Sequence, residues 1–193
     1  IAANGAEPGD VKFANLDGSE DGKITADDRT ILGYKKENFR MSFGNTFRYK
    51  DFELYMLFTG IFGGNGYGQA VNYYAFRTSS DVQGDNNFNH GWWTPENKSN
   101  KYPRINYTDG RYTPLQGYGF VRLQDLSLSY TFRQPWVQKA GIGNLKVYMA
   151  CKNLFTISGW EGGDPEVQQT LGSGYTYGYP LSRTVSFGLN LTF

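Results

Sequence analysis

Apolar and polar side chains alternate strictly over the last twelve residues of the chain. The odd positions from Val185 to Phe193 are apolar, and the even positions between them carry Ser, Gly, Asn or Thr. A period of two predicts a β-strand with one apolar and one polar face. About eleven such residues, tilted by about 45°, span roughly 25 Å, which matches the apolar band of a transmembrane β-barrel. A strand of a soluble β-sandwich alternates in the same way, so this segment alone leaves both architectures open.

Four earlier segments alternate similarly and are predicted to be antiparallel strands: 40–49, 52–62, 120–132 and 145–155. Of the connections within this series, 50–51 is short, 133–144 is of medium length, and 63–119 and 156–181 are long, with 63–119 rich in Gly, Asn and aromatic residues. Residues 1–39 are expected to form a loop, with one short helix near 26–31. The pattern therefore predicts an all-β fold with five strands and loops of very unequal length.

If the strands run alternately up and down, the longer loops all lie at one end of the sheet and the shorter turns at the other. Residues 1–39, 63–119 and 156–181 then fall on one side, and the turns 50–51 and 133–144 fall on the other. Long structureless loops are uncommon in compact domains, but outer-membrane barrels carry long extracellular loops and short periplasmic turns. We therefore expect residues 1–39 to be an extracellular loop and residues 40–193 to form one incomplete barrel domain. Because about eight strands are needed to close a barrel, this chain is expected to be the C-terminal piece of a longer one.

Composition is consistent with a barrel wall. Aromatic residues make up 17% of the chain, with 15 Tyr and 14 Phe, whereas hydrophobic residues reach only 39%. Abundant interface aromatics with moderate hydropathy are typical of transmembrane barrels, although a secreted β-sandwich can match them too. The net charge of +1 argues against a nucleic-acid partner. No apolar run approaches the roughly 18 residues that a transmembrane helix requires.

A calcium-binding loop is predicted at residues 17–28. Oxygen ligands at positions 1, 3, 5, 7, 9 and 12 would come from Asp17, Ser19, Asp21, the Lys23 carbonyl, Thr25 and Asp28, with Gly22 forming the sharp turn. Asp at position 12, in place of the usual Glu, is similar to dockerin loops. The sequence therefore predicts a structural Ca²⁺ site, and a plain Asp/Gly-rich turn without metal is the alternative.

The long loop contains many aromatic residues. Tyr73, Tyr74, Trp92 and Trp93 are candidate substrate-binding residues, since aromatic faces can stack on sugar rings. The alternative is a local aromatic core that gives a long loop its shape. No catalytic constellation accompanies them: His90 is the only histidine, and the acidic pair Asp164 and Glu166 lies in a turn. We therefore do not expect an enzyme.

Seven short motifs, in order along nearly the whole chain, resemble the C-terminal region of the SusC/RagA family of TonB-dependent outer-membrane transporters. They are GDVKF at 9–13, YKDFEL at 49–54, WTPEN at 93–97, FVRLQDLSLSY at 120–130, NLFT at 153–156, GDPE at 163–166 and the segment 179–193. Each motif is short, but the ordered set is specific. The departures are residues 18–20, where the family more often has Asn-Gly, and the single cysteine, Cys151.

The resemblance implies the last five strands of a plugged barrel of the 22-stranded type in the bacterial outer membrane. Such transporters import oligosaccharides or oligopeptides, work with a SusD-like surface lipoprotein and draw energy through TonB. The expected partners are therefore the N-terminal barrel and plug of the same transporter, the lipoprotein, TonB, membrane lipid and a glycan or peptide substrate. The alternative function, from a different class of protein, is that of a secreted β-rich carbohydrate-binding or adhesion module with a dockerin-like calcium loop.

Overall fold

The computed structural model describes residues 6–19, 22–67, 91–104, 107, 115–160, 164–170 and 179–193 of the 193-residue chain. The chain divides into two compact units. The first comprises Ile1–Tyr34 and Tyr67–Gln116, and the second comprises Lys35–Gly66 and Gly117–Phe193. The second unit contains the main sheet, and the first contains the predicted calcium loop together with Trp92 and Trp93.

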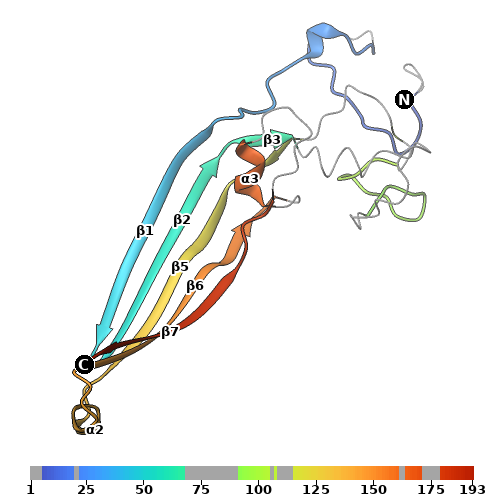
Figure 1. The fold of residues 1–193 in the computed structure, drawn as a ribbon. Helices are drawn as coiled ribbons and strands as arrows, with labels where there is room; N and C mark the ends of the chain where they lie inside the picture. The colour runs from blue at the N-terminus through green and yellow to red at the C-terminus, as the bar shows by residue number, and fades with distance from the viewer. Residues whose placement is uncertain are drawn as a thin grey trace. The chain divides into compact units, whose positions relative to one another are not determined.

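Five long strands form one antiparallel sheet in the second unit (Figure 1). They are β1 (Glu37–Tyr49), β2 (Phe52–Gly63), β5 (Phe120–Phe132), β6 (Asn144–Ser158) and β7 (Thr184–Thr192). The order across the sheet is β1-β2-β5-β6-β7, so each strand pairs with the next one along the chain. All five predicted strands and the all-β fold class are thereby confirmed. The observed ends differ from the predicted ones by up to three residues at either end of a strand.

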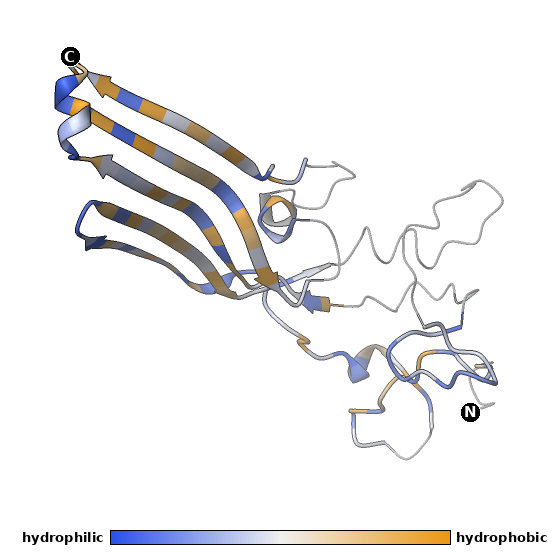
Figure 2. Ribbon diagram, turned by 90° about the horizontal axis from the view of Figure 1, so that it is seen from below, coloured by the Kyte–Doolittle hydropathy of each residue, from blue (hydrophilic) through white to orange (hydrophobic). Residues whose placement is uncertain are grey.

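Hydrophobic and hydrophilic residues alternate along the long strands, which appear as bands of orange and of blue or white (Figure 2). Because successive side chains of a strand point to opposite faces, the sheet has one face of mainly apolar side chains, here called the apolar face, and one of mainly polar side chains, the polar face. Paired residues share a face, so the register extends each face across strands. On the apolar face, Phe47 pairs with Leu54, and Leu54 with Leu128. The apolar face continues through Met149 to Phe187. On the polar face, the corresponding neighbours are Arg48, Glu53, Ser129, Tyr148 and Gly188.

The apolar face is uncovered. Phe187 is 78% exposed and Leu189 is 65% exposed, and Phe43, Phe47 and Val185 are each more than half exposed. The buried apolar cluster of the second unit is small and consists of Ile61, Tyr118, Phe120 and Trp160. An exposed apolar face that extends over five strands marks a surface that contacts something other than water.

One irregularity changes the face of an important side chain. In β5 the register with β2 passes directly from Leu57–Asp125 to Phe58–Leu123, which leaves Gln124 as an extra residue. Such a bulge reverses the alternation beyond it. Arg122 consequently lies on the polar face, whereas uninterrupted alternation with Leu126 and Leu128 would have placed it on the apolar face.

The structure also contains short elements that the alternation did not predict. These are β3 (Asn65–Tyr67) and β4 (Leu115–Gly117), which pair with each other, and the helices α2 (Pro135–Lys139) and α3 (Pro165–Thr170). The helix expected near 26–31 is a single 3₁₀ turn, Ala26–Asp28, which ends where Arg29 becomes extended. Elements of three to six residues are too short to show a period. Among the described residues, no helix has the length and apolar character needed to cross a membrane.

Candidate functional site

The clearest concentration of buried charge lies on the polar face, around Arg122. This residue is only 2% exposed. Its Nε donates to Thr156 Oγ1 at 2.9 Å, its Nη1 to Glu166 Oε2 at 2.5 Å and its Nη2 to Asp164 Oδ1 at 2.6 Å. Because a guanidinium presents its donors in a planar fork, it can hold both carboxylates and the neighbouring strand at once. Arg122 therefore fastens α3 to β5 and β6.

Asp164 organises the segment around α3. Its Oδ1 also accepts the backbone N–H of Glu166 at 3.0 Å, which caps the start of the helix, and its Oδ2 accepts the N–H of Leu181 at 3.2 Å. Burial by itself would raise the pKa of the Asp164 carboxyl, but the bond from Arg122 and the two backbone N–H groups outweigh that effect and lower the pKa below its usual value. Asp164 is thus ionised at neutral pH and joins the segment before β7 to the helix.

A polar pocket of about 350 Å³ lies beside this ion cluster. Its walls come from β5, β6, the start of α3 and the segment before β7: Arg122, Asn153, Thr156, Ser158, Trp160, Asp164, Pro165, Pro180, Leu181 and Arg183. Asn153 has a positive φ of 51°, and its Nδ2 donates to the Ser182 carbonyl at 3.1 Å, so it joins β6 to the approach of β7. We call this cavity the Arg122 pocket.

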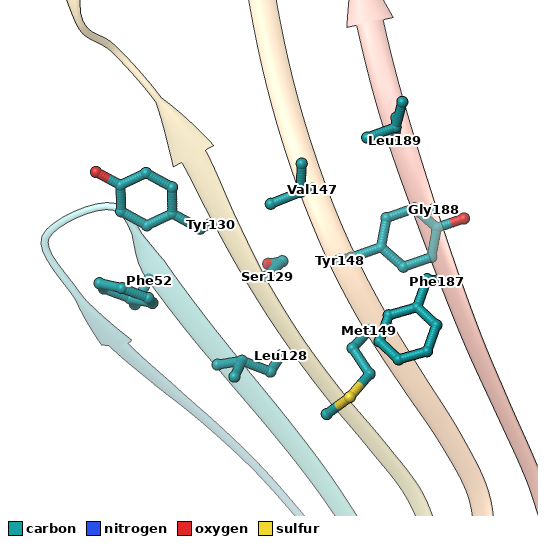
Figure 3. Close-up of a pocket in the computed structure, with 10 residues that line it drawn as sticks. All are labelled: Phe52, Leu128, Ser129, Tyr130, Val147, Tyr148, Met149, Phe187, Gly188 and Leu189. Atoms are coloured by element: carbon teal, nitrogen blue, oxygen red, sulfur yellow. The ribbon is translucent and has the colours of Figure 1, made fainter.

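A second, shallow groove of about 420 Å³ lies near the other end of the sheet (Figure 3). The side chains that line it include Leu128, Val147, Met149, Phe187 and Leu189, all of which belong to the apolar face. The groove is mainly apolar, and the hydroxyl-bearing residues among those that line it are Ser129, Tyr130 and Tyr148.

The predicted substrate-binding residues fall elsewhere. Tyr73 and Tyr74 lie outside the described residues. Trp93 belongs to the first unit and packs against Gly9, where an added β-carbon would lie 2.8 Å from Trp93 Cδ2. The ring of Trp92 lies 6.1 Å from that of Tyr102, and Asn97 Nδ2 donates to the Trp92 carbonyl at 2.8 Å. Both tryptophans thus contribute to local packing, and a role in binding substrate stays a prediction.

Near Trp93, a second arginine joins distant parts of the first unit. Arg104 Nε donates to Asp10 Oδ1 at 2.5 Å, its Nη1 lies 3.1 Å from Glu7 Oε2, and its backbone N–H donates to the Gly9 carbonyl at 2.8 Å. The motifs at 9–13 and 93–97 are therefore neighbours in space. This contact has a structural role in holding the two segments together.

The predicted calcium loop is closed by hydrogen bonds from its own backbone. Asp28 Oδ1 accepts the N–H groups of Leu16 at 2.6 Å and Asp17 at 3.1 Å, and Oδ2 accepts the N–H of Thr25 at 2.7 Å. The bonds from Thr25 and then Leu16 lower the pKa of the Asp28 carboxyl. Asp21 lies outside the described residues, and among those described no group of three or more His, Cys, Asp or Glu could hold a metal ion. The Ca²⁺ site, with Ser19 and Lys23, stays a prediction.

The known proteins with sequences similar to this chain include several TonB-dependent receptors. TonB-dependent receptor P3 of Formosa agariphila is 31% identical over 199 residues, which cover 97% of this chain and 19% of that protein. TonB-dependent receptor P26 of the same organism is 28% identical over 198 residues, 96% of this chain and 20% of that protein. TonB-dependent receptor SusC of Bacteroides thetaiotaomicron is 34% identical over 76 residues, 38% of this chain and 7% of that protein.

A solved structure of the RagAB peptide importer in its closed-closed state matches with a TM-score of 0.64 at 23% identity, over 89% of this chain and 19% of that chain. No protein-family model matches the sequence. The chain spans about a fifth of the length of the curated relatives P3 and P26.

Proposed function

We propose that this chain, which is related over nearly its whole length to the SusC/RagA type of TonB-dependent receptors, forms the last five strands of an outer-membrane importer. The relatives are not enzymes, and the fold matches the barrel portion of such a transporter. In the complete protein these strands would close a plugged barrel of the 22-stranded type in the bacterial outer membrane. The cargo is an oligosaccharide or an oligopeptide, delivered with a SusD-like lipoprotein and driven through TonB.

The observation that carries the proposal is the uncovered apolar face. Strands of nine or more residues are long enough to cross a bilayer at a barrel tilt, and β7, the shortest of the five, has nine. Lipid tails would cover Phe187, Leu189 and their neighbours without any further protein layer. The polar face, which carries Arg48, Glu53 and the Arg122 pocket, would then line the lumen.

The sheet also ends in two open edges, β1 and β7. An unpaired strand edge is untenable inside a membrane, because its N–H and C=O groups find no water there. Strands from the rest of the transporter would pair with both edges. The alternative, a secreted binding module, would have to cover the apolar face with a second layer, and among the described residues no such layer covers it.

Cysteine labelling in the full-length receptor tests the membrane topology directly. In a Cys151→Ala background, Phe187→Cys should resist a charged, water-soluble maleimide in the membrane-inserted receptor and react with it once the receptor is unfolded, because the thiolate that reacts does not form in a lipid environment. Its neighbour Ser186→Cys, on the opposite face, is the matched control and should react with the water-soluble reagent. Equal reactivity of both positions toward the charged reagent would contradict a lipid-exposed sheet.

Uptake tests the transport itself. Cells that express the receptor and its lipoprotein partner should accumulate fluorescent oligosaccharides or oligopeptides, and a protonophore should abolish that accumulation. A general porin substrate measured in the same cells controls for leakage. Uptake that persists after the proton gradient is collapsed would overturn TonB-driven import.

A further inference from the structure

The shallow groove near the turn 50–51 is formed by two neighbouring rows of paired residues on the apolar face (Figure 3). The row nearer the turn crosses β2, β5, β6 and β7 in the order Phe52, Tyr130, Val147 and Leu189. The next row contributes Leu128, Met149 and Phe187. A groove of about 420 Å³ with these walls suits a hydrocarbon chain, because both rows offer apolar contact and lie open on the surface of the sheet.

Aromatic side chains continue from the groove toward α2. The rings of Phe52 and Tyr130 lie 4.6 Å apart, and the ring of Phe132 lies 4.7 Å from that of Tyr130. The ring of Trp136, a residue of α2 that is 52% exposed, lies 5.9 Å from that of Phe132. Tyr and Trp are enriched where a membrane meets water, since one part of each ring is apolar and another is polar. This end of the groove therefore has the composition of a headgroup region.

A lysine lies on the same side of the sheet as the groove. Lys50 Nζ is 5.3 Å from the centre of the Tyr49 ring, and Tyr49 pairs with Phe52, which lines the groove. An ammonium group over an aromatic face is attracted by the ring and keeps its hydrogens available for an anion. The charge of Lys50 is thus directed toward the apolar face at the end of the groove.

An arginine from the neighbouring turn adds to this charge. Arg133 follows Phe132 directly, its side chain is 76% exposed, and its Nε lies 2.9 Å from Asp51 Oδ1. A carboxylate accepts at most two hydrogen bonds from the fork of a guanidinium, which has five N–H donors, so Arg133 retains donors for a second anion. Lys139 in α2 is a further cation, and Asp51 is the one acidic side chain within residues 50–51 and 133–139.

We propose that the groove and the two cations Lys50 and Arg133 bind one anionic phospholipid of the adjacent membrane leaflet. An acyl chain lies in the groove, and the phosphate accepts hydrogen bonds from Lys50 Nζ and the Arg133 guanidinium. A molecule that joins an anion to a hydrocarbon chain is what this combination of surfaces complements. The site rests on the proposed lipid exposure of the apolar face and adds to it a preference for one headgroup charge at one place on the barrel.

Native mass spectrometry of the detergent-purified full-length receptor tests the headgroup preference. The receptor is equilibrated with mixed micelles of equal amounts of palmitoyl-oleoyl phosphatidylglycerol and palmitoyl-oleoyl phosphatidylcholine, which share their acyl chains and differ in net charge. The wild type should retain phosphatidylglycerol about 10-fold over phosphatidylcholine, since one Lys or Arg near an anionic lipid surface contributes a factor of about 5 and Asp51 offsets part of the total. Equal retention of the two lipids would overturn the site.

Charge variants connect this preference to the turn end of the groove. Lys50→Gln and Arg133→Gln should each reduce it to about 3-fold, and the double variant should abolish it. Arg48→Gln is the matched control, because Arg48 is an equally exposed cation at the same end of β1 but lies on the polar face. It should keep the wild-type preference. A preference that persists in the double variant would place the anionic lipid elsewhere and overturn the proposal.

A third variant tests the groove itself. Val147→Trp fills the groove with a ring and leaves both cations in place, so it should lower the retention of phosphatidylglycerol at least as much as the loss of one cation. Unchanged retention in Val147→Trp would show that no acyl chain occupies the groove. The maleimide protection of Phe187→Cys is measured separately. Protection of Phe187→Cys without any phosphatidylglycerol preference means that this site alone fails, whereas loss of the protection means that the proposed lipid exposure fails as well.

Discussion

The ring of Tyr148 lies directly over Gly188 on the neighbouring strand (Figure 3). The two residues are paired across β6 and β7 on the polar face, and a β-carbon at position 188 would lie only 2.6 Å from Tyr148 Cε1. An aromatic side chain that covers a glycine shields the bare backbone and fixes the register of the pair. Because β7 is an edge strand here, this contact helps to define how the last strand is aligned.

Adding a side chain at residue 188 should therefore destabilise the sheet. We expect Gly188→Ala to lower the free energy of unfolding by about 1–3 kcal/mol, since the tyrosine ring must move away. In a Tyr148→Ala background the same substitution should have little effect, which gives a coupling measurable by a double-mutant cycle in detergent. Ser186→Ala, two positions away on the same face, is the control. Additive effects of the two substitutions would show that the ring and the glycine are not coupled.

The two faces of β7 should respond differently to charge. Leu189 is exposed on the apolar face, and Asn190 is the next residue on the polar face. Leu189→Arg should cost roughly 2–4 kcal/mol if it lies near the bilayer midplane, whereas Asn190→Arg should cost much less. Reversible unfolding of the full-length receptor in lipid vesicles measures both. Equal penalties would mean that the face assignment is wrong.

The strands and their faces were predictable because alternation reports directly which side chains share a face. Val185, Phe187 and Leu189 need no information beyond their spacing to be placed together. The same rule fails at Arg122, since a single extra residue at Gln124 reverses the alternation and nothing in the local sequence reveals a bulge. A lone arginine between Phe120 and Leu123 was nevertheless a signal, because a charge among apolar strand residues requires a partner.

The partners of Arg122 were hidden by distance along the chain. Asp164 and Glu166 follow 42 and 44 residues later and were interpreted from the sequence as part of a turn. Pro165 at the start of a short helix and Asp164 just before it form a recognisable helix start, but six residues are too few for a helical period. The contact of this helix with β5 depends on tertiary packing, which the hydrophobic pattern of the sequence does not reveal.

Removing Arg122 should release α3 from the sheet. Arg122→Met leaves one nearly buried carboxylate and one half-exposed carboxylate without their cation. Breaking a buried pair costs roughly 3–5 kcal/mol, and we expect the lower end because Glu166 reaches solvent. Hydrogen exchange at residues 164–167 should accelerate strongly. Arg133→Met removes an exposed pair with Asp51 and should change stability by about 1 kcal/mol or less, so it serves as the control.

The ionisation of Asp164 should make this segment sensitive to acid. Its pKa is lower in the folded chain than the ordinary value of 3.8, so the ionised form stabilises the fold. That contribution is complete above the ordinary pKa and is lost as the pH falls through the lower, folded-state value. The difference in unfolding free energy between wild type and Asp164→Asn should therefore be constant near neutral pH and shrink below pH 3.8. A difference that grows as the pH falls would contradict the sign of this shift.

In the loop at residues 17–28, the Asp28 carboxylate accepts backbone hydrogen bonds and is also a predicted calcium ligand. Asp28 already holds Leu16, Asp17 and Thr25 through backbone hydrogen bonds, so it closes the loop without an ion. We therefore expect Asp28→Asn to open the loop and increase protease cleavage between residues 16 and 28, whether or not calcium is present.

Calcium binding should depend on Asp21 and be visible only in the millimolar range. Extracellular calcium modules bind with dissociation constants of about 10⁻⁴–10⁻³ M, and Ser19 in place of a carboxylate puts this loop at the weak end. Millimolar Ca²⁺ should slow cleavage of the wild-type loop in the full-length receptor, and a chelator should reverse the effect. Asp21→Asn should abolish the calcium response, because it removes a charged ligand from the middle of the loop. Asp27→Asn, which changes an acidic residue outside the predicted ligand set, should retain it. Identical cleavage of the wild type in Ca²⁺ and in chelator would leave a hydrogen-bonded turn that binds no metal.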